Sequence, residues 1–327
     1  QQYFPSSGWV EHDADEILDV QKAVMDAVIR DVGAHNVAAI GITNQRETAV
    51  AWSRSTSKPL CNAIVWQCRR TTPLCEEIRA KGLADDIRDR TGLLVDPYFS
   101  ATKWSWMLKN IPDVAAAAAA NDLAFGTIDS WLIHGLTSGT SHVTDTSNAS
   151  RTLLFNIKML TWDPVLCDIF DVPAAALPTV LPSDATFGHY TVDGIQIPIR
   201  AVLGDQQAAL FGQGCFGPGM LKCTLGTGSF LLVNAGTTPP KPPTGILGTI
   251  AWTINGMTTY ALEGSVFIAG AAVQWLRDGL GIIASSSDVQ TLAATVPDAG
   301  GVVFVPALSG LGAPYWNPNV RGTIFGI

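Results

Sequence analysis

The chain has 327 residues, of which 47% are hydrophobic and 15% are charged, a composition that builds large apolar cores and excludes intrinsic disorder. Its length predicts two domains of ordinary size rather than one. The net charge is −8 and no cluster of Lys or Arg occurs, which argues against nucleic acid and anionic membranes as partners.

Cysteines and histidines give no sign of disulfides or of a zinc site. Six cysteines lack any C-x-x-C pair, and the five histidines are far apart in the sequence. The apolar run at 114–120 has only seven residues, too few to span a membrane. We therefore expect a cytoplasmic protein. Because the chain starts at Gln1 and stops inside the apolar run ending at Ile327, we also expect both ends to have been cut.

The first 213 residues alternate between helical and strand patterns. Asp13 and Glu16 have the spacing of a capping box, and the apolar periodicity that follows lasts until Gly33, which predicts a helix over 14–32. Further helices are expected near 70–81, 100–109, 128–136 and 163–170, and strands at 37–43, 48–53, 62–66 and 197–203. This alternation is typical of an α/β domain with a covered sheet.

After Gly214 the pattern changes to hairpins. Two are predicted at 220–236 and 246–264, the second with an Asn255-Gly256 turn, followed by a helix at 265–280 and a strand at 301–308. We therefore place the domain boundary near 212–215, which gives domains 1–213 and 214–327.

Two short polar motifs are candidates for chemistry. Gly226-Thr227-Gly228 at a strand-to-strand turn can cradle a phosphate, although G-x-G also makes ordinary tight turns. Arg46-Glu47 follows a predicted buried strand and can bind hydroxyl groups, but the pair also fits a solvated loop.

Asp205 and Trp66 each allow a structural and a functional interpretation. Asp205 can cap a helix over 206–211, or accept a proton that a hydroxyl loses late in the formation of a bond to phosphorus. Trp66 can pack in a core or form one wall of a polyol pocket. The residue chemistry alone leaves these alternatives open.

Nine segments, in order, resemble the glycerol kinases, a branch of the FGGY carbohydrate kinase family. They cover essentially the whole chain: GWVEHD (8–13), AAIGITNQRET (38–48), NAIVWQCRR (62–70), TGLLVDPYFSATKWSWML (91–108), HVTDTSNASRTLLFN (142–156), GDQQAALFGQ (204–213), GTGSF (226–230), YALEGSVFIAGAAVQWLRD (260–278) and LSGLGAPYW (308–316).

The resemblance implies a two-domain, actin-like and ribonuclease-H-like α/β fold, with both domains incomplete in this chain and the active site in the cleft between them. It implies transfer of the γ-phosphoryl group of ATP to glycerol, giving sn-glycerol 3-phosphate, with Mg²⁺ as a cofactor. No metal-binding residue is identified. The intact protein is expected to be a homo-oligomer.

The resemblance also assigns site residues. It implies that Asp205 is the general base and that the polyol hydroxyls contact Arg46, Glu47, Tyr98, Asp205 and Gln206. Trp66 and Phe230 match positions that line the carbon skeleton. Nucleotide contacts match Gly226, Thr227, Gly228, Gly270 and Gln274.

Two departures from the family pattern concern activity and regulation. The family's N-terminal phosphate hairpin and glycine-rich adenine motif have no counterpart in this chain, so we expect the chain itself to be weakly active or inactive. The stretch 187–200 lacks the paired glycines and the arginine of a fructose 1,6-bisphosphate loop, so we expect no such control. Two alternatives stay open: another FGGY kinase acting on a different polyol, or a non-catalytic actin-like binding module.

Overall fold

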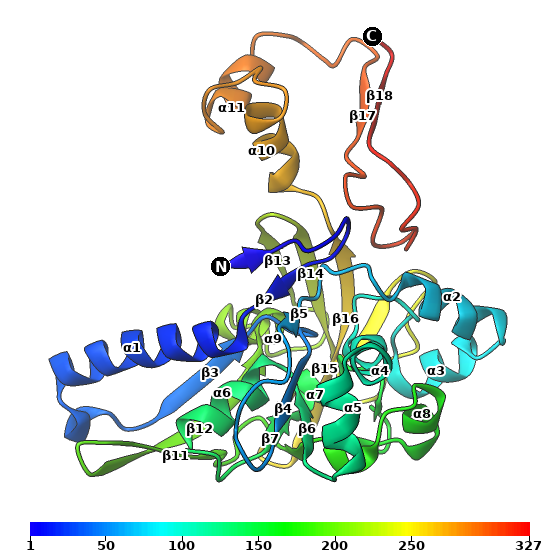
Figure 1. The fold of residues 1–327 in the computed structure, drawn as a ribbon. Helices are drawn as coiled ribbons and strands as arrows, with labels where there is room; N and C mark the ends of the chain where they lie inside the picture. Colours follow the sequence, from blue (N-terminus) through cyan, green and yellow to red (C-terminus); the bar gives the residue numbers. More distant parts are fainter. The chain divides into compact units, whose positions relative to one another are not determined.

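The computed structural model describes all 327 residues and divides into two compact units (Figure 1). The first unit contains residues 1–208, 235–241 and 248–261, and the second contains residues 209–234, 242–247 and 262–327. The chain passes between the units within its later strands. Each unit is therefore described by itself.

Helix α1 (Ala14–Val32) opens the regular part of the first unit, with the bounds that the sequence predicts. The Asp13 side chain accepts a hydrogen bond from the Glu16 amide at 3.0 Å, and Gly33 ends the helix with a φ of 80°. Helix α6 (Ile128–Leu136) also has its predicted bounds, and its Trp131 indole donates to the Ala14 carbonyl at 2.7 Å. This bond ties α6 to the start of α1.

A three-stranded sheet with the order β11-β12-β3 forms the centre of the first unit. Strand β12 (Ile195–Gly204) pairs in parallel with β3 (Ile40–Asn44) and antiparallel with β11 (Gly188–Val192). Helices α1 and α6 pack against this sheet, and the shared core includes Trp52, Trp131, Ile199 and Val202. Because β3 and β12 are parallel neighbours, their carboxyl ends lie at the same edge.

The rest of the first unit consists of short strands and helices around this sheet. Its antiparallel pairs are β1 (Gln2–Tyr3) with β2 (Glu11–His12), β2 with β5 (Ala63–Ile64), β4 (Val50–Ser53) with β6 (Leu123–Gly126), and β8 (Phe155–Asn156) with β9 (Thr161–Trp162); β7 (Val143–Asp145) and β10 (Thr179–Leu181) are parallel. The remaining helices are α2 (Thr72–Ala80), α3 (Ala84–Thr91), α4 (Ser100–Asn110), α5 (Pro112–Ala119), α7 (Thr146–Ala149) and α8 (Pro164–Ile169), with 3-10 turns at Ala34–Asn36 and Ala174–Ala176.

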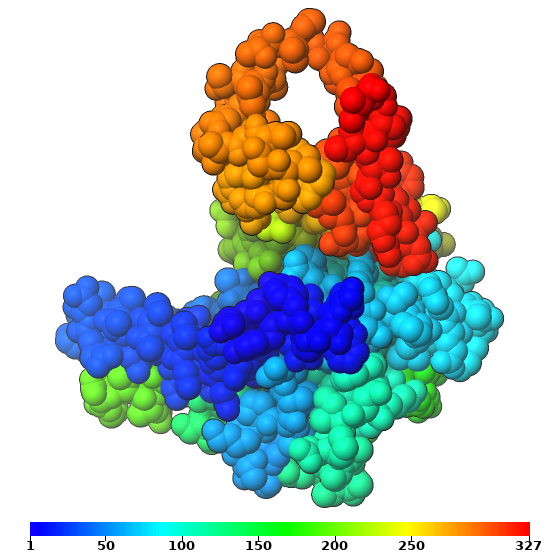
Figure 2. All heavy atoms as spheres, turned by 45° about the horizontal axis from the view of Figure 1, so that its top comes forward, coloured from blue at the N-terminus to red at the C-terminus, as the bar shows by residue number.

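An apolar groove of about 470 Å³ lies between α1 and β3, lined in part by Val24, Val28, Ile40 and Leu132. Val24 and Val28 are more than half exposed along α1, which is drawn in blue in Figure 2. The groove contains none of the polar residues singled out in the sequence. No helix of the chain has the length and apolar character that crossing a bilayer requires.

Helix α9 (Asp205–Gly212) leads from β12 into the second unit. A four-stranded sheet with the order β13-β14-β16-β15 follows, and the last three of these strands contribute residues to both units. Its strands are β13 (Leu221–Leu225), β14 (Ser229–Gly236), β15 (Leu247–Ile254) and β16 (Met257–Val266); helices α10 (Gly270–Asp278) and α11 (Asp288–Ala293) and the pair β17 (Val303–Val305) and β18 (Thr323–Phe325) complete the unit.

Both predicted hairpins are confirmed, with the Asn255-Gly256 turn at positive φ. The helix predicted over 265–280 is too long, because β16 continues to Val266 and α10 begins only at Gly270. Apolar residues of the strand end and of the helix follow one another directly in the sequence, so the helical periodicity extends too far back.

Candidate active site

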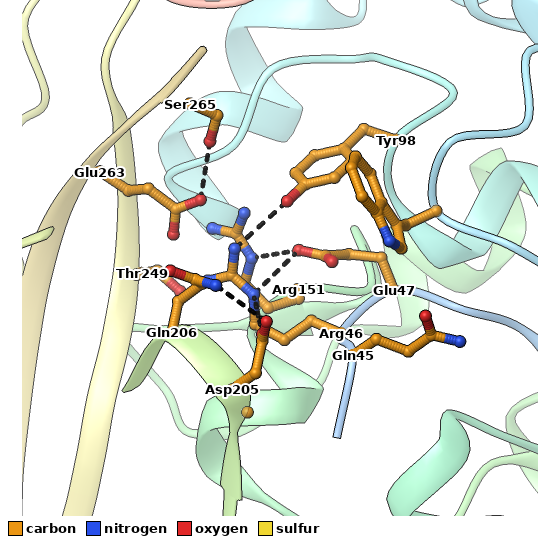
Figure 3. Close-up of polar contacts among 12 residues, drawn as sticks. Gln45, Arg46, Glu47, Tyr98, Arg151, Asp205, Gln206, Thr249, Glu263 and Ser265 are labelled. Atoms are coloured by element: carbon orange, nitrogen blue, oxygen red, sulfur yellow. Dashed lines mark hydrogen bonds and ion pairs between the residues drawn. The ribbon is translucent and has the colours of Figure 1, made fainter. Parts of the chain in front are cut away.

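Polar residues gather where β3 and β12 end. The register pairs Asn44 with Gly204, so the turn carrying Arg46 and Glu47 and the helix beginning at Asp205 leave the sheet side by side (Figure 3). The carboxyl edge of parallel strands is where open α/β sheets bind ligands. The topology therefore brings together two motifs that are about 160 residues apart in the sequence.

Arg46 is the centre of this cluster, with only 1% of its side chain exposed. Its Nε atom lies 3.5 Å from a carboxylate oxygen of Glu47 and 3.5 Å from one of Asp205. Its Nη atoms donate to the Tyr98 hydroxyl and to the Gln207 side chain, each at 3.2 Å. A guanidinium group suits this position because its planar fork donates in several fixed directions.

Glu47 is held in a strained backbone conformation, with a φ of 59°. The Thr48 amide donates to the Arg46 carbonyl at 2.7 Å, which closes a tight turn around Glu47, and the Ser100 hydroxyl donates to the Glu47 carbonyl. The Glu47 carboxylate accepts a hydrogen bond from Arg151 Nε at 2.7 Å. A non-glycine residue in this region costs roughly 1–3 kcal/mol, and such strain clusters at functional sites.

Asp205 is the accessible carboxylate of the cluster. Its side chain is 42% exposed, whereas those of Arg46 and Glu47 are almost completely buried. The Asp205 carboxylate accepts from Gln206 Nε2 at 2.8 Å. Interpreting Asp205 as a helix cap is wrong, because Asp205 is the first residue of α9 and its carboxylate faces two side chains instead of backbone amides.

Two aromatic rings lie beside these polar groups. Tyr98 is buried and stands edge-on to the half-buried Trp66, with ring centroids 5.6 Å apart. The Trp66 amide is fixed by the Thr48 hydroxyl at 3.3 Å. An apolar wall beside a set of donors and acceptors is what a small polyol requires, because it presents C–H groups on one face and hydroxyls on another.

A buried polar network supports the end of β3. Asn44 Nδ2 donates to the side-chain oxygens of Asn148 at 3.0 Å and Asp129 at 3.5 Å, and the hydroxyls of Thr127 and Thr144 also donate to Asp129. Burial raises the pKa of Asp129 to about 6, although the two hydroxyl bonds oppose this shift. The network was not predicted from the sequence.

Asp129 gives a testable pH dependence. Its pKa is 3.8 in a model compound and about 6 in the fold, so the stabilisation from its protonated form is complete below pH 3.8 and is lost as the pH rises through 6. This shift corresponds to about 3 kcal/mol. We expect the free energy of urea unfolding of the wild type, relative to Asp129→Asn, to fall by an amount of this order between pH 4 and pH 7. A constant difference across this range would contradict the assignment.

In the second unit, the turn Gly226–Gly228 between β13 and β14 packs against the start of α10. The amides of Ala269 and Gly270 donate to the Thr227 and Gly226 carbonyls, each at 2.8 Å. A Cβ atom on Gly270 would lie 2.6 Å from the Gly226 carbonyl oxygen, so only glycine permits this approach.

The same turn has groups that can bind an anion. The amides of Thr227 and Gly228 donate to no other group of the protein; Thr227 is exposed, whereas Gly228 is buried. Consecutive free amides at a turn form a concave site for phosphate oxygens. Gln274, one helical turn after Gly270, is also exposed, and the partly buried Phe230 follows the turn on β14.

Gly270→Ala tests the packing of the turn. The new methyl group must displace either α10 or the turn, so we expect the second unit to lose roughly 1–3 kcal/mol of stability. Gly264→Ala is the matched control, because a Cβ atom there meets only a side-chain methyl group at 4.0 Å. Thermal unfolding of both variants measures the effect, and equal melting temperatures would show that the close approach is unimportant.

The structure places the predicted residues in two groups. Arg46, Glu47, Trp66, Tyr98, Asp205 and Gln206 lie together in the first unit, and Gly226, Thr227, Gly228, Phe230, Gly270 and Gln274 belong to the second. Sequence reasoning missed Gln207 and Arg151, which bond to Arg46 and Glu47. Arg151 lies in HVTDTSNASRTLLFN (142–156), one of the segments that carry the resemblance, which assigns no role to any single residue there. The chain contains no group of three or more His, Cys, Asp or Glu side chains that could hold a metal ion.

Models of one family match both parts of the chain. The N-terminal domain model of the FGGY family of carbohydrate kinases matches residues 1–212, and the C-terminal domain model matches residues 221–327. Curated relatives include glycerol kinase 2 of Thermotoga maritima, 54% identical, and a glycerol kinase of Shewanella sp. (strain MR-4), 53% identical. Each match covers 100% of this chain and 67% of the relative.

Solved structures give the same result. The crystal structure of Plasmodium falciparum glycerol kinase with ADP matches with a TM-score of 0.89 and 38% identity, over 100% of this chain and 66% of that one. The ligand-bound xylulose kinase of Lactobacillus acidophilus matches with a TM-score of 0.85 at 24% identity, over the same shares, and shows the fold alone. The predicted two-domain, actin-like fold is confirmed, and the chain spans about two thirds of the length of these relatives.

Proposed function

The chain belongs to the FGGY family of carbohydrate kinases, and we propose that its site binds glycerol and serves transfer of the γ-phosphoryl group of ATP to a terminal hydroxyl, giving sn-glycerol 3-phosphate. The main support is the cluster of Arg46, Glu47 and Asp205 at the carboxyl ends of β3 and β12. Relatives at 53–54% identity that are named glycerol kinases favour glycerol over other polyols.

Each residue of the first-unit cluster has a distinct role in this proposal. The Arg46 guanidinium donates to hydroxyl oxygens, and the Glu47 carboxylate accepts from hydroxyl protons. Gln206 and Tyr98 offer a further donor and acceptor beside them, and Trp66 contacts the C–H face. A compact set of this kind matches three hydroxyls on a three-carbon skeleton.

Asp205 serves as the general base. As the terminal oxygen of glycerol forms its bond to the γ-phosphorus, its proton passes to the Asp205 carboxylate, and the bond from phosphorus to the bridging oxygen of ADP breaks. The partly exposed position of Asp205 lets a substrate reach it, while Arg46 at 3.5 Å fixes its orientation. In phosphoryl transfer the protein contributes mainly positioning and electrostatic stabilisation, so a fixed carboxylate is suited to the task.

The second-unit turn provides the phosphate contacts. This role is supported by the free amide of the exposed Thr227 and by the close packing of Gly270 on the turn. Mg²⁺ is part of the proposal, since it neutralises phosphate charge in such reactions and keeps several water ligands. We keep residues 1–213 as the proposed polyol-binding domain and residues 214–327 as the proposed nucleotide-binding domain.

A substrate panel tests the proposal. Because the chain spans two thirds of its relatives, the assay uses a chimeric protein in which these 327 residues replace the aligned part of the Thermotoga maritima relative. We expect ADP release with glycerol and little with xylulose or gluconate. Faster turnover of xylulose or gluconate would favour another sugar kinase of the family. Absence of turnover with every substrate would favour a non-catalytic binding module.

A further inference from the structure

The buried segment Thr146–Arg151 contacts the ends of both strands that carry the first-unit cluster, β3 and β12. Its Asn148 side chain accepts from Asn44 at the end of β3 at 3.0 Å. Its Ser147 hydroxyl accepts from the amide of Gly204, the residue before Asp205, at 3.0 Å.

Asp145 holds this segment in place through hydrogen bonds. Its carboxylate accepts from the backbone amides of Ser147 and Asn148, each at 2.9 Å, and from the Ser183 hydroxyl at 2.8 Å. Because every residue of the segment is buried, it has little freedom to move. The segment is therefore rigid, and it fixes the backbone position of its last residue, Arg151.

The side chain of Arg151 contacts two candidate polyol-binding residues, Glu47 and Tyr98. Its side chain is completely buried, and its Nε atom donates to Glu47 Oε1 at 2.7 Å. Its guanidinium carbon lies 5.2 Å from the ring centroid of Phe99 and 5.7 Å from that of Tyr98. Cation–π contacts of this kind hold the guanidinium plane in place. The same oxygen of Glu47 lies 3.5 Å from Arg46 Nε, so it is shared by two guanidinium groups.

Glu47 lies near two arginines and a buried lysine, which differ in the groups that they contact. Arg46 is also close to Asp205, so its single charge faces two carboxylates. The nearby Lys103 is completely buried on α4 and donates to the Tyr98 and Phe99 carbonyls, and burial lowers its pKa to about 8. Arg46 thus divides its charge between two carboxylates and Lys103 donates to backbone carbonyls, whereas Arg151 Nε donates to Glu47 itself.

We propose that Arg151 is a positioning residue that keeps Glu47 ionised and oriented as the hydroxyl acceptor of the polyol site. This inference rests on the proposed function for the identity of the ligand, but its effect on Glu47 exists without any ligand. Arg151 acts through Glu47 and the Tyr98 ring, and the geometry gives it no separate role in the chemistry.

Carboxyl-carbon NMR of the 327-residue chain tests the effect on Glu47 directly. The chain has only six glutamates, so labelling glutamate with ¹³C at Cδ gives six carboxyl signals, and the one that Glu47→Gln removes belongs to Glu47. We expect Arg151→Met to move the titration of this signal at least one pH unit upward, because removing a cation within 4 Å of a carboxylate favours its protonated form. Arg151→Lys should restore much of the titration, since it keeps the charge without the fork.

Glycerol binding is the second measurement. At pH 8 we expect Arg151→Met to weaken glycerol binding roughly tenfold. We expect this loss to grow as the pH falls, because Glu47 of the variant then takes up a proton at pH values at which Glu47 of the wild type is still ionised. Arg70→Met is the matched control, because Arg70 is equally buried and forms a 2.7 Å ion pair with Glu11 away from the site. It should leave the Glu47 titration and the pH profile of binding unchanged.

The outcomes separate this inference from the proposed function. If the wild-type chain binds no glycerol, the proposed function fails, while the Glu47 titration without ligand still decides the role of Arg151. If Arg151→Met leaves the Glu47 titration unchanged, or if Arg70→Met changes it equally, the inference is overturned.

Discussion

Replacing Asp205 with asparagine is expected to lower the rate of phosphoryl transfer by about 100-fold or more while leaving glycerol binding within a few-fold of the wild type. Asparagine has nearly the same shape and can still bond to Gln206, whose amide faces Asp205 at 2.8 Å. It cannot accept the proton of the reacting hydroxyl. The change therefore removes the base and little of the binding site.

The chimeric protein described above measures this prediction through kcat and, separately, glycerol affinity. Asp193→Asn is the matched control, because Asp193 is exposed in the turn between β11 and β12 and has a φ of 50°, which asparagine tolerates well. Full turnover in the Asp205 variant would remove the base assignment. A parallel loss of kcat and affinity would instead give Asp205 a role mainly in binding.

Gly204→Ala is expected to weaken glycerol binding roughly tenfold to a hundredfold, although Gly204 has no side chain to contact a ligand. A Cβ atom there would lie 2.7 Å from Arg46 Cγ and 2.9 Å from Gln207 Oε1. Arg46 must then move, and its bonds to Tyr98 and its contacts with both carboxylates move with it. Overpacking of this kind typically costs about 1–3 kcal/mol.

Gly212→Ala provides the control for Gly204→Ala. Gly204 precedes α9 and Gly212 is the last residue of α9, but a Cβ atom on Gly212 meets nothing within 4 Å, and alanine favours helix formation. Isothermal titration with glycerol should therefore show wild-type affinity for Gly212→Ala and a clear loss for Gly204→Ala. Equal affinities in both variants would show that Arg46 tolerates displacement.

Local structure could be predicted well wherever short-range chemistry decides it. The Asp13 cap, the Gly33 end and the helix between them follow from residues a few positions apart, and so does the Asn255-Gly256 turn. The candidate site was identified residue by residue through its resemblance to a family, since neither Arg46-Glu47 nor Asp205 has a decisive pattern of its own. Their proximity depends on the parallel pairing of β3 with β12, which a single sequence does not reveal.

The supporting residues could not be predicted because their roles depend on contacts across long sequence distances. Arg151 is 104 positions from Glu47, and Asn44 is equally far from Asn148. In the sequence, the Ser, Asn and Thr residues at 144–152 have the pattern of a polar loop. In the fold they are buried. These residues contribute to stability only when all of their hydrogen bonds are formed. No local sequence pattern distinguishes them from polar residues that face solvent.

The most direct test of the account is titration of glycerol into the 327-residue chain, as wild type and as Glu47→Gln. Glutamine keeps the shape of Glu47 but neither its charge nor its ion pairs with Arg46 and Arg151. The account predicts saturable binding of one glycerol per chain for the wild type and binding at least ~100-fold weaker for the variant, because a buried charged acceptor is lost. Equal binding by both proteins, or no binding by the wild type, would contradict the assignment of this cluster as the polyol site.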